Sequence, residues 1–296
     1  MIEESLFLPF QNGQLHIRHF SQHPAGIPVV LVHGSIENGK IFYSKSGKGL
    51  APFLAKMGFS VYVPDLKGRG KSTPPISRHL RYSQTETITQ ELPVIYQFIA
   101  ERHPKQKQHW MAHSWGGVLI LAFLARHPSI SLGSMAFLGT KRSISVVHLT
   151  KIWRVDVLWS GLGEILTRVY GYLPAIEWKF GSDNEPAIFY RQVRSWVRDT
   201  QKWIDPEDGF DYRAAFTRQQ VAPTLYLTGQ ADDHLGHPTD VQRLMKEVGN
   251  PSDRFILLSK KNEHLADYDH ISILTSPHAE QDHFPLLVDW IKQHST

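Results

Sequence analysis

A short stretch near the middle of the chain places a strand, a tight turn and a helix in immediate succession. His109 to Ala112 is an apolar strand candidate, Ser114 lies in the turn, and a helix is expected over Trp115 to Arg126. A strand that leads directly into an apolar helix is typical of a parallel sheet, because parallel strands need a crossover connection. This stretch therefore favours an α/β architecture.

The rest of the chain repeats the alternation of strands and helices. Asn12-Gly13 is a hairpin signal between the first two strands, and Pro93 should kink or restart the helix that contains it. The pattern predicts a mostly parallel central sheet with helices on both faces. Strands are expected over Ser5 to Phe10, Gln14 to Phe20, Pro28 to Val32, Phe59 to Val63, Ser134 to Leu138, Thr224 to Thr228 and Phe255 to Leu258. Helices are expected over Gly49 to Met57, from a capping box at Ser83 toward Glu101, over Thr239 to Val248 and over Phe284 to His294.

Residues 141–220 interrupt this alternation. They read as helices and loops, and we expect them to form a helical cap inserted into a core made of residues 1–140 and 221–296. Most aromatic side chains of the interval are expected to form a small core of the cap itself, with a few facing a pocket. These aromatic residues are Trp153, Trp159, Tyr170, Tyr172, Trp178, Phe180, Phe189, Tyr190, Trp196 and Trp203.

Composition narrows the class of protein. The 296 residues suffice for one sizeable globular domain with an inserted subdomain. The absence of cysteine excludes disulfides and a cysteine nucleophile, and it fits a reducing compartment. The N-terminal residues lack the basic segment of a signal peptide, and the longest apolar run, Gly117 to Ala125, is too short to cross a membrane. We expect a cytoplasmic protein without integral membrane association.

The residues around Ser114 fit a small-x-Ser-x-Gly pattern between a strand and a helix. Such a turn strains the serine backbone and crowds the positions two residues away, and Ala112 and Gly116 are both small. The serine hydroxyl would project above a helix N-terminus, where partial positive charge favours a developing anion. We predict that Ser114 is a nucleophile; the alternative is a small residue that fills a tight turn.

A second signal lies at the end of the strand over Pro28 to Val32. His33-Gly34 would let the chain turn sharply and present the N–H of Ser35, and the N–H of Trp115 would be the second donor. Acyl transfer needs such a pair of backbone donors aimed at an oxyanion. The alternative is an ordinary glycine at the end of a strand.

These motifs resemble those of the α/β-hydrolase superfamily, and the similarity runs nearly end to end. His33-Gly34, Asp65 to Ser72 and Ala112 to Gly116 occur in the family's order. The segment Asp65 to Ser72 matches the family's D-x-x-G-x-G-x-S loop. Its Gly-Lys-Ser end also resembles a phosphate-binding loop, but Asp65 stands where that motif requires its first glycine. The resemblance implies an α/β-hydrolase fold with a triad in the order Ser, Asp, His.

The acid of the implied triad follows the strand over Thr224 to Thr228. The family usually places it three residues beyond the glycine that ends this strand, which is the position of Asp232 here, with Asp233 as the alternative. Its role is to hold the tautomer of the histidine and to stabilise the positive charge that forms on the ring.

Two histidines after the last strand are candidates for the base. The segment Asp269 to Leu274 resembles the catalytic histidine segment of acid lipases, in which an aspartate usually stands at the position of Ser272. We therefore choose His270 as the base. His264 and His278 are expected to have structural or surface roles.

The resemblance implies a serine hydrolase that forms an acyl-enzyme on Ser114. The leading expectation is a carboxylic-ester hydrolase of the esterase or lipase type, and the aromatic cap favours a small-molecule ester or acyl substrate with an apolar portion. Thioester, amide and carbon–carbon bond hydrolysis use the same triad. Epoxide hydrolysis and dehalogenation are disfavoured, because relatives with those activities carry aspartate at the position of Ser114. A non-catalytic ligand-binding protein and an enzyme acting at a membrane surface are the alternatives from other classes.

No cofactor, metal or nucleic-acid partner is expected. The formal net charge of +4 is scattered along the chain rather than clustered. His234 and His237 have a permissive spacing for a metal, but no further ligands are clearly placed to complete a site. We expect His237-Pro238 to begin the following helix instead. The oligomeric state is left open.

Overall fold

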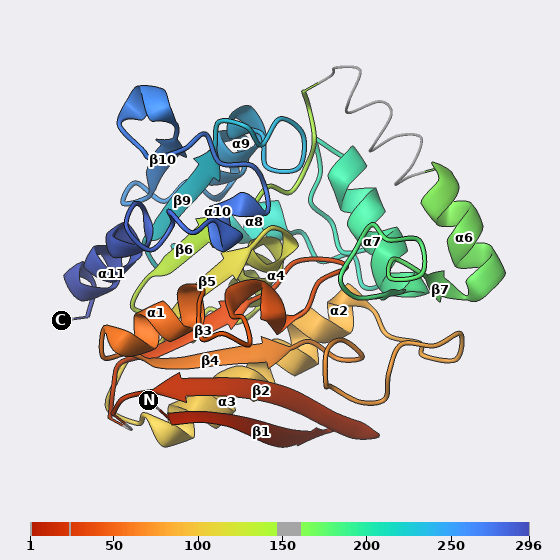
Figure 1. Cartoon of the computed structure of the whole chain (residues 1–296). Coiled ribbons are helices and arrows are strands. Elements are labelled where there is room, and N and C mark those ends of the chain that lie inside the picture. Colours follow the sequence, from red (N-terminus) through yellow and green to blue (C-terminus); the bar gives the residue numbers. More distant parts are fainter. Residues whose placement is uncertain (1, 24, 147–160, 296) are drawn as a thin grey trace.

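The computed structural model describes residues 2–23, 25–146 and 161–295, and its centre is an eight-stranded sheet (Figure 1). The order of the strands in the sheet is β1-β2-β4-β3-β5-β6-β9-β10. The β1–β2 and β2–β4 pairs are antiparallel, whereas every pair from β4 to β10 is parallel. The expected mostly parallel sheet is therefore confirmed. The strands are β1 (Ile2–Phe10), β2 (Gly13–Ser21), β3 (Pro28–Val32), β4 (Ser60–Asp65), β5 (His109–His113), β6 (Met135–Leu138), β9 (Thr224–Gly229) and β10 (Arg254–Leu258).

The helices agree closely with the sequence pattern. Ser83 and Glu86 form both hydrogen bonds of the predicted capping box. Thr87–Glu91 is a π-helical turn, and α3 begins directly after it with Pro93 in its first turn, where the missing N–H of proline is tolerated. The expected disturbance at Pro93 thus takes the form of a π-helical turn within a continuous helical segment. The helices of the core are α1 (Leu50–Lys56), α2 (Gln84–Glu86), α3 (Leu92–Arg102), α4 (Trp115–Arg126), α9 (Pro238–Val248), α10 (Ser272–Thr275) and α11 (Phe284–Gln293).

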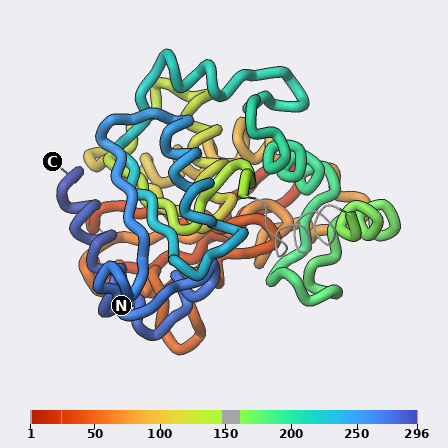
Figure 2. The backbone as a smooth tube through the Cα atoms, turned by 90° about the horizontal axis from the view of Figure 1, so that it is seen from above, coloured from red at the N-terminus to blue at the C-terminus, as the bar shows by residue number. Residues whose placement is uncertain are grey.

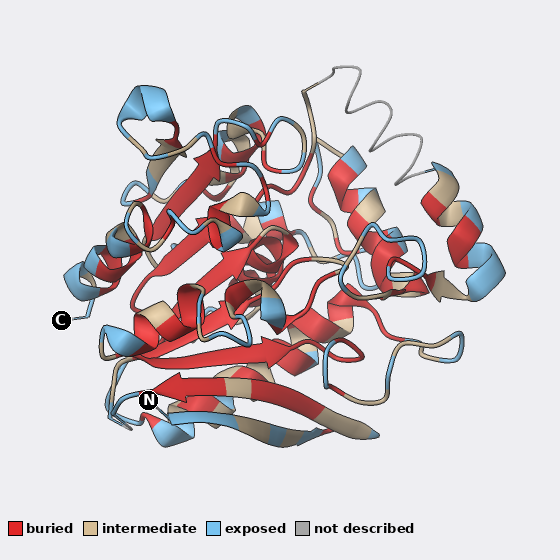
Figure 3. Ribbon diagram, viewed as in Figure 1, coloured by how far each residue is buried: buried red, intermediate tan, exposed pale blue. Residues whose placement is uncertain are grey.

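Both faces of the sheet are covered, so its inner strands are buried (Figure 3). Successive side chains of a strand point to opposite faces. Val30 and Val32 belong to a buried cluster with α3 and α4, whereas Val29 and Leu31 belong to a second cluster with α1 and α11. Burial on both sides explains why these strands read as continuous apolar runs rather than as alternating patterns.

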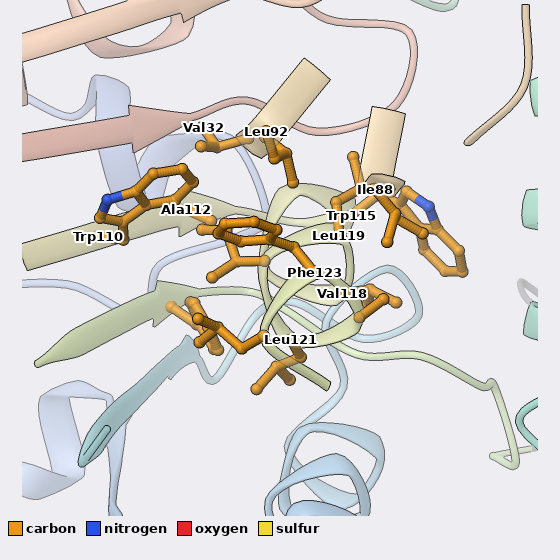
Figure 4. Close-up of a cluster of buried hydrophobic side chains, with 14 of the residues drawn as sticks. Val32, Ile88, Leu92, Trp110, Ala112, Trp115, Val118, Leu119, Leu121 and Phe123 are labelled. Carbon is orange, nitrogen blue, oxygen red and sulfur yellow. The ribbon is translucent and has the colours of Figure 1, made fainter. Parts of the chain in front are cut away.

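Helix α4 is the best-buried helix next to the sheet. Every residue from Trp115 to Ala125 is buried, and the ring of Phe123 stacks on that of Trp110, with centroids 5.6 Å apart (Figure 4). Full burial of one large apolar side chain stabilises a fold by roughly 1.5–3 kcal/mol. The packing of α4 therefore fixes the position of its N-terminus, and with it the turn that contains Ser114.

The described part of residues 141–220 lies between β6 and β9. It contains α6 (Gly163–Tyr170), β7 (Tyr172–Leu173), β8 (Glu185–Pro186), α7 (Ala187–Arg198) and α8 (Tyr212–Phe216). β7 and β8 pair antiparallel, which the sequence pattern did not predict. In Figures 1 and 2, α6 lies on the opposite side of the molecule from the two chain ends.

The expectation of a separate aromatic core in this interval is wrong for its buried tryptophans. Trp196 and Trp203 belong to the same buried cluster as Trp110. The ring of Trp196 lies 6.2 Å from that of Trp115 at the start of α4, so α7 extends the core of the sheet. Phe189 also joins this cluster, whereas Tyr170, Trp178 and Phe180 are exposed, and Trp153 and Trp159 lie outside the described residues.

Candidate active site

Ser114 occupies a strained turn between β5 and α4. Its backbone has φ 51° and ψ −124°, a conformation that non-glycine residues rarely adopt. A Cβ atom at Gly116 would clash with the carbonyl oxygen of Val32 and approach that of His33 to 2.6 Å. This confirms the predicted crowding two residues after the serine. Backbone strain of this kind costs of order 1–3 kcal/mol and is maintained by the packing on either side.

The structure brings together Ser114, Asp232 and His270, which lie on three separate segments. His270 Nδ1 lies 2.6 Å from Asp232 Oδ2, and His270 Nε2 lies 2.9 Å from Ser114 Oγ. An ionised carboxylate only accepts hydrogen bonds, so Nδ1–H donates to Asp232 and Nε2 is left to accept the hydroxyl of Ser114. This is the arrangement in which an imidazole can take a proton from a serine.

The alternative acid and base lie elsewhere. His264 pairs with Asp282 at 2.7 Å, in the segment after β10. Asp233 pairs with the neighbouring His234 through a carboxylate that is more than half exposed. The contacts with Ser114 and His270 therefore favour His270 over His264 and Asp232 over Asp233.

Buried contacts adjust the ionisation of the two titratable groups. Burial alone would raise the pKa of Asp232, but the positive charge and hydrogen bond of His270 and the N–H of Gly236 outweigh it, so the pKa is lowered. Asp232 Oδ1 accepts from the N–H groups of Leu235 and Gly236, at 3.1 and 2.7 Å. For His270, burial is the largest cause and lowers the pKa, although Asp232 opposes it. The pair is thus held as a carboxylate and a neutral imidazole.

The loop after β3 lies directly against the turn at Ser114. A Cβ atom at Gly34 would lie 2.9 Å from Ser114 Cβ, so only glycine fits between the two segments. Trp115 is the first residue of α4, and its N–H has no acceptor within the helix. The two predicted oxyanion donors, the N–H groups of Ser35 and Trp115, therefore belong to adjoining segments.

Sequence reasoning missed a carboxylate that holds this loop. Glu185 in β8 accepts the hydroxyl of Ser35 at 2.6 Å and the N–H of Ile36 at 2.8 Å. It also forms a fully buried ion pair with Arg69. Glu185 lies 150 residues from Ser35, so no local pattern could have linked them.

Sequence reasoning also missed a hydrogen-bonded pair that joins the loop after β3 to the end of β5. Glu37 Oε2 lies 2.9 Å from Nδ1 of His113, the residue before Ser114. His113 lies in the segment around Ser114 that the sequence singled out, whereas Glu37 lies just beyond Ser35, and their spacing of 76 residues gives no hint of contact.

The Asp65-to-Ser72 segment has a structural role. Asp65 accepts from the N–H groups of Gly39 and Lys71, at 2.8 and 2.9 Å, and the hydroxyl of Ser72 donates to the carbonyl oxygen of Asp65. The carboxylate closes the loop on itself, in agreement with the hydrolase loop rather than a phosphate-binding one.

The two histidines weighed as metal ligands do not gather a ligand set. The ring of His237 caps the start of α9, as expected from the following proline. Across residues 2–23, 25–146 and 161–295 no group of three or more His, Asp or Glu side chains is arranged to hold a metal ion. Within the same ranges, every helix is too short or too polar to span a bilayer.

Comparisons with known proteins agree with this geometry. The model of the α/β hydrolase fold family matches residues 27–165, which include Ser114 and the loop after β3. Proline iminopeptidase of Lactobacillus crispatus is 26% identical over 171 residues, 57% of this chain and 50% of that protein. Lysophospholipase L2 of Escherichia coli K12 is 31% identical over 116 residues, 38% of this chain and 32% of that protein. The chain thus spans half or less of the length of these relatives.

Solved structures share the fold across the whole chain. A soluble variant of monoglyceride lipase from Saccharomyces cerevisiae has a TM-score of 0.70 at 13% identity, over 100% of this chain and 97% of that one. An esterase from Thermogutta terrifontis has a TM-score of 0.61 at 17% identity, with full coverage of both chains. Together with the strand order and the strained serine turn, these matches show that the chain has the α/β-hydrolase fold, and residues 27–165 match the model of that fold family.

Proposed function

We propose that this protein is a serine hydrolase that cleaves carboxylic esters through an acyl-enzyme on Ser114. The observation that carries the proposal is the continuous set of hydrogen bonds from Ser114 through His270 to Asp232. The strained turn that exposes the hydroxyl above the start of α4 adds to it. The relatives include an iminopeptidase and a lysophospholipase, and both names support hydrolysis as the class of reaction.

The proposed reaction has two halves. The Ser114 oxygen attacks the carbonyl carbon of the ester while His270 Nε2 takes the hydroxyl proton, and Asp232 stabilises the resulting imidazolium. The N–H groups of Ser35 and Trp115 stabilise the oxyanion. The imidazolium then gives its proton to the departing alcohol. A water molecule deprotonated by His270 attacks the acyl-enzyme, and its collapse releases the carboxylic acid and restores the Ser114 hydroxyl.

Two features favour an apolar ester over an N-terminal peptide as substrate. Leu235 and Ile271, next in the chain to the triad segments, are exposed to 38% and 46% and offer apolar surface. Glu37 and Glu185 already pair with cationic partners, so neither carboxylate is available for a substrate amine. The cap that we propose over residues 141–220 would supply further apolar contacts.

A fluorophosphonate probe tests the nucleophile directly. The purified wild type should gain the mass of one adduct, and peptide mapping should locate it on Ser114. The Ser114→Ala variant, with unchanged circular dichroism, should gain none. A folded wild type that never gains an adduct would favour a non-catalytic ligand-binding protein, and an adduct on another serine would reject Ser114.

An ester panel then separates the reaction classes. Nitrophenyl esters of increasing acyl length should be hydrolysed faster than a prolyl nitroanilide and an acyl thioester of matched length. Faster hydrolysis of the prolyl amide would move the assignment to a peptidase. Activity that requires vesicles, together with co-flotation of the protein, would indicate action at a membrane surface.

The activity should persist at pH values below 6.5, the ordinary pKa of histidine. The base must be neutral to accept the Ser114 proton, and activity is lost as the pH falls through the pKa of His270. Because burial lowers this pKa below its ordinary value of 6.5, the acid limb of kcat/KM should lie below pH 6.5. Profiles of ester hydrolysis from about pH 4 to 9 measure this limb, and a midpoint above 6.5 would contradict the assigned environment of His270.

A further inference from the structure

His113 is buried between two acceptors. Its Nδ1 lies 2.9 Å from Glu37 Oε2, and its Nε2 lies 2.8 Å from the backbone carbonyl oxygen of His270. The ring has no exposed surface. A carbonyl oxygen never donates, so Nε2 must carry a proton. If Glu37 is ionised, Nδ1 carries one as well, and His113 is an imidazolium.

The environment favours the ionised pair. Burial alone would lower the pKa of His113, but the charge and hydrogen bond of Glu37 outweigh it, and the pKa is raised. Burial alone would raise the pKa of Glu37, but the charge of His113 outweighs it, and the pKa is lowered. Glu37 Oε2 also accepts from the N–H of Gly34 at 2.9 Å, a further contact that stabilises the carboxylate.

The pair connects three parts of the site. Through Gly34 it holds the residue before Ser35, whose N–H is a proposed oxyanion donor. Through the chain it holds the end of β5 next to Ser114. Through the backbone carbonyl it holds His270, and the two histidine rings lie 4.7 Å apart.

We propose that Glu37 and His113 are positioning residues, and that their ion pair sets the distance between the loop after β3, Ser114 and His270 and keeps His270 neutral. This inference rests on the proposed serine hydrolase. It goes beyond that proposal because neither residue belongs to the triad or to the oxyanion donors.

The effect of the ion pair on the protonation of His270 follows from the charged groups around that ring. The ring of His113 lies 4.7 Å from that of His270, and its positive charge lowers the pKa of His270 more than the charge of Lys141 does. If His113 became neutral, protonation of His270 would be easier and the acid limb of activity would move to higher pH. The charged groups that face His270 are Asp232 after β9, His113 at the end of β5, Lys141 after β6 and Glu37 after β3, with Asp269 as its chain neighbour.

Nitrogen NMR tests the ion pair without any assay of activity. The protein is labelled with ¹⁵N-histidine, and the ring signals of His113 are those missing from His113→Gln. Titration of both ring nitrogens should give a pKa for His113 above the ordinary value of 6.5 in the wild type. A pKa of 6.5 or lower for His113, in the folded wild type, would overturn the proposal. This result stands whether or not the protein hydrolyses esters.

Kinetics test the positioning role. Glu37→Gln should lower kcat/KM roughly 10- to 100-fold, as expected for loss of a group that orients catalytic atoms, and should move the acid limb to higher pH. The matched control is His16→Gln, which removes another buried histidine paired with a carboxylate, at 2.8 Å from Asp65. It should lower thermal stability but leave the acid limb unchanged.

The outcomes are distinguishable. An unchanged acid limb in folded Glu37→Gln, or one that moves equally in His16→Gln, would reject a specific role for the pair. Fluorophosphonate labelling of the wild type reports separately on the proposed function. If the wild type does not label, the serine hydrolase fails, while the NMR experiment still decides whether the ion pair exists.

Discussion

Replacing His270 with glutamine should lower kcat for ester hydrolysis by on the order of 10⁵-fold or more, because removal of the base disables the triad as a unit. Glutamine keeps a polar side chain of similar reach, but it cannot accept the Ser114 proton. Steady-state hydrolysis and the rate of fluorophosphonate labelling both measure the loss. Circular dichroism and thermal melting should show a folded protein.

The matched control for this substitution is His264→Gln. His264 is also a histidine with a carboxylate partner after β10, yet it lies in a separate hydrogen-bonded pair with Asp282. Its replacement should change kcat less than about tenfold, because the lost hydrogen bond to Asp282 does not involve Ser114, His270 or Asp232. If His264→Gln instead abolishes labelling and His270→Gln does not, the base has been assigned to the wrong histidine.

Replacing Asp232 with asparagine should lower kcat by about 10⁴-fold, through the tautomer of His270. The asparagine amide can donate to Nδ1, which moves the ring proton to Nε2. A protonated Nε2 can no longer accept from Ser114, although the two lie 2.9 Å apart. The N–H groups of Leu235 and Gly236 can still donate to the amide oxygen, so the loop should keep its conformation.

Asp233→Asn provides the comparison at the neighbouring position. The Asp233 carboxylate is 57% exposed and pairs with His234 rather than with His270. Its replacement should leave kcat within about threefold of the wild type, a surface-like effect. A large loss in Asp233→Asn together with a small loss in Asp232→Asn would move the acid to Asp233.

Much of the fold could be predicted because local signals agreed with the tertiary structure. Alternating strand and helix patterns predict a parallel sheet, and β3, β5 and α4 begin or end within one residue of their expected bounds. The capping box at Ser83 gave the start of a helix through its own hydrogen bonds. The β7–β8 pair was missed, because strands of two residues carry no periodicity.

The role of the aromatic interval depended on tertiary packing. Composition showed that residues 141–220 are rich in aromatic side chains, but it could not say which surface they cover. Trp196 packs against Trp115 at the start of α4 and Trp203 packs against Trp196, whereas Trp178 remains 48% exposed. The difference arises because the hydrophobic effect is non-directional, so an aromatic side chain packs against any apolar surface that the fold places beside it.

The sequence by itself determined which candidate catalytic residues the chain contains and the order in which they occur. These candidates are local features, since each follows a strand or turn that can be recognised from neighbouring residues. They are a serine in a turn of small residues, two adjacent aspartates, and two histidines after the last strand. The proposed choice of Asp232 over Asp233, and of His270 over His264, rests on contacts that only the tertiary structure provides. Hydrogen bonds act over about 3 Å, and the contacts of the site join residues from 38 to 157 positions apart. Only the packed sheet, which brings the ends of β3, β5, β6 and β9 to one edge, sets those distances and buries Glu37 beside His113.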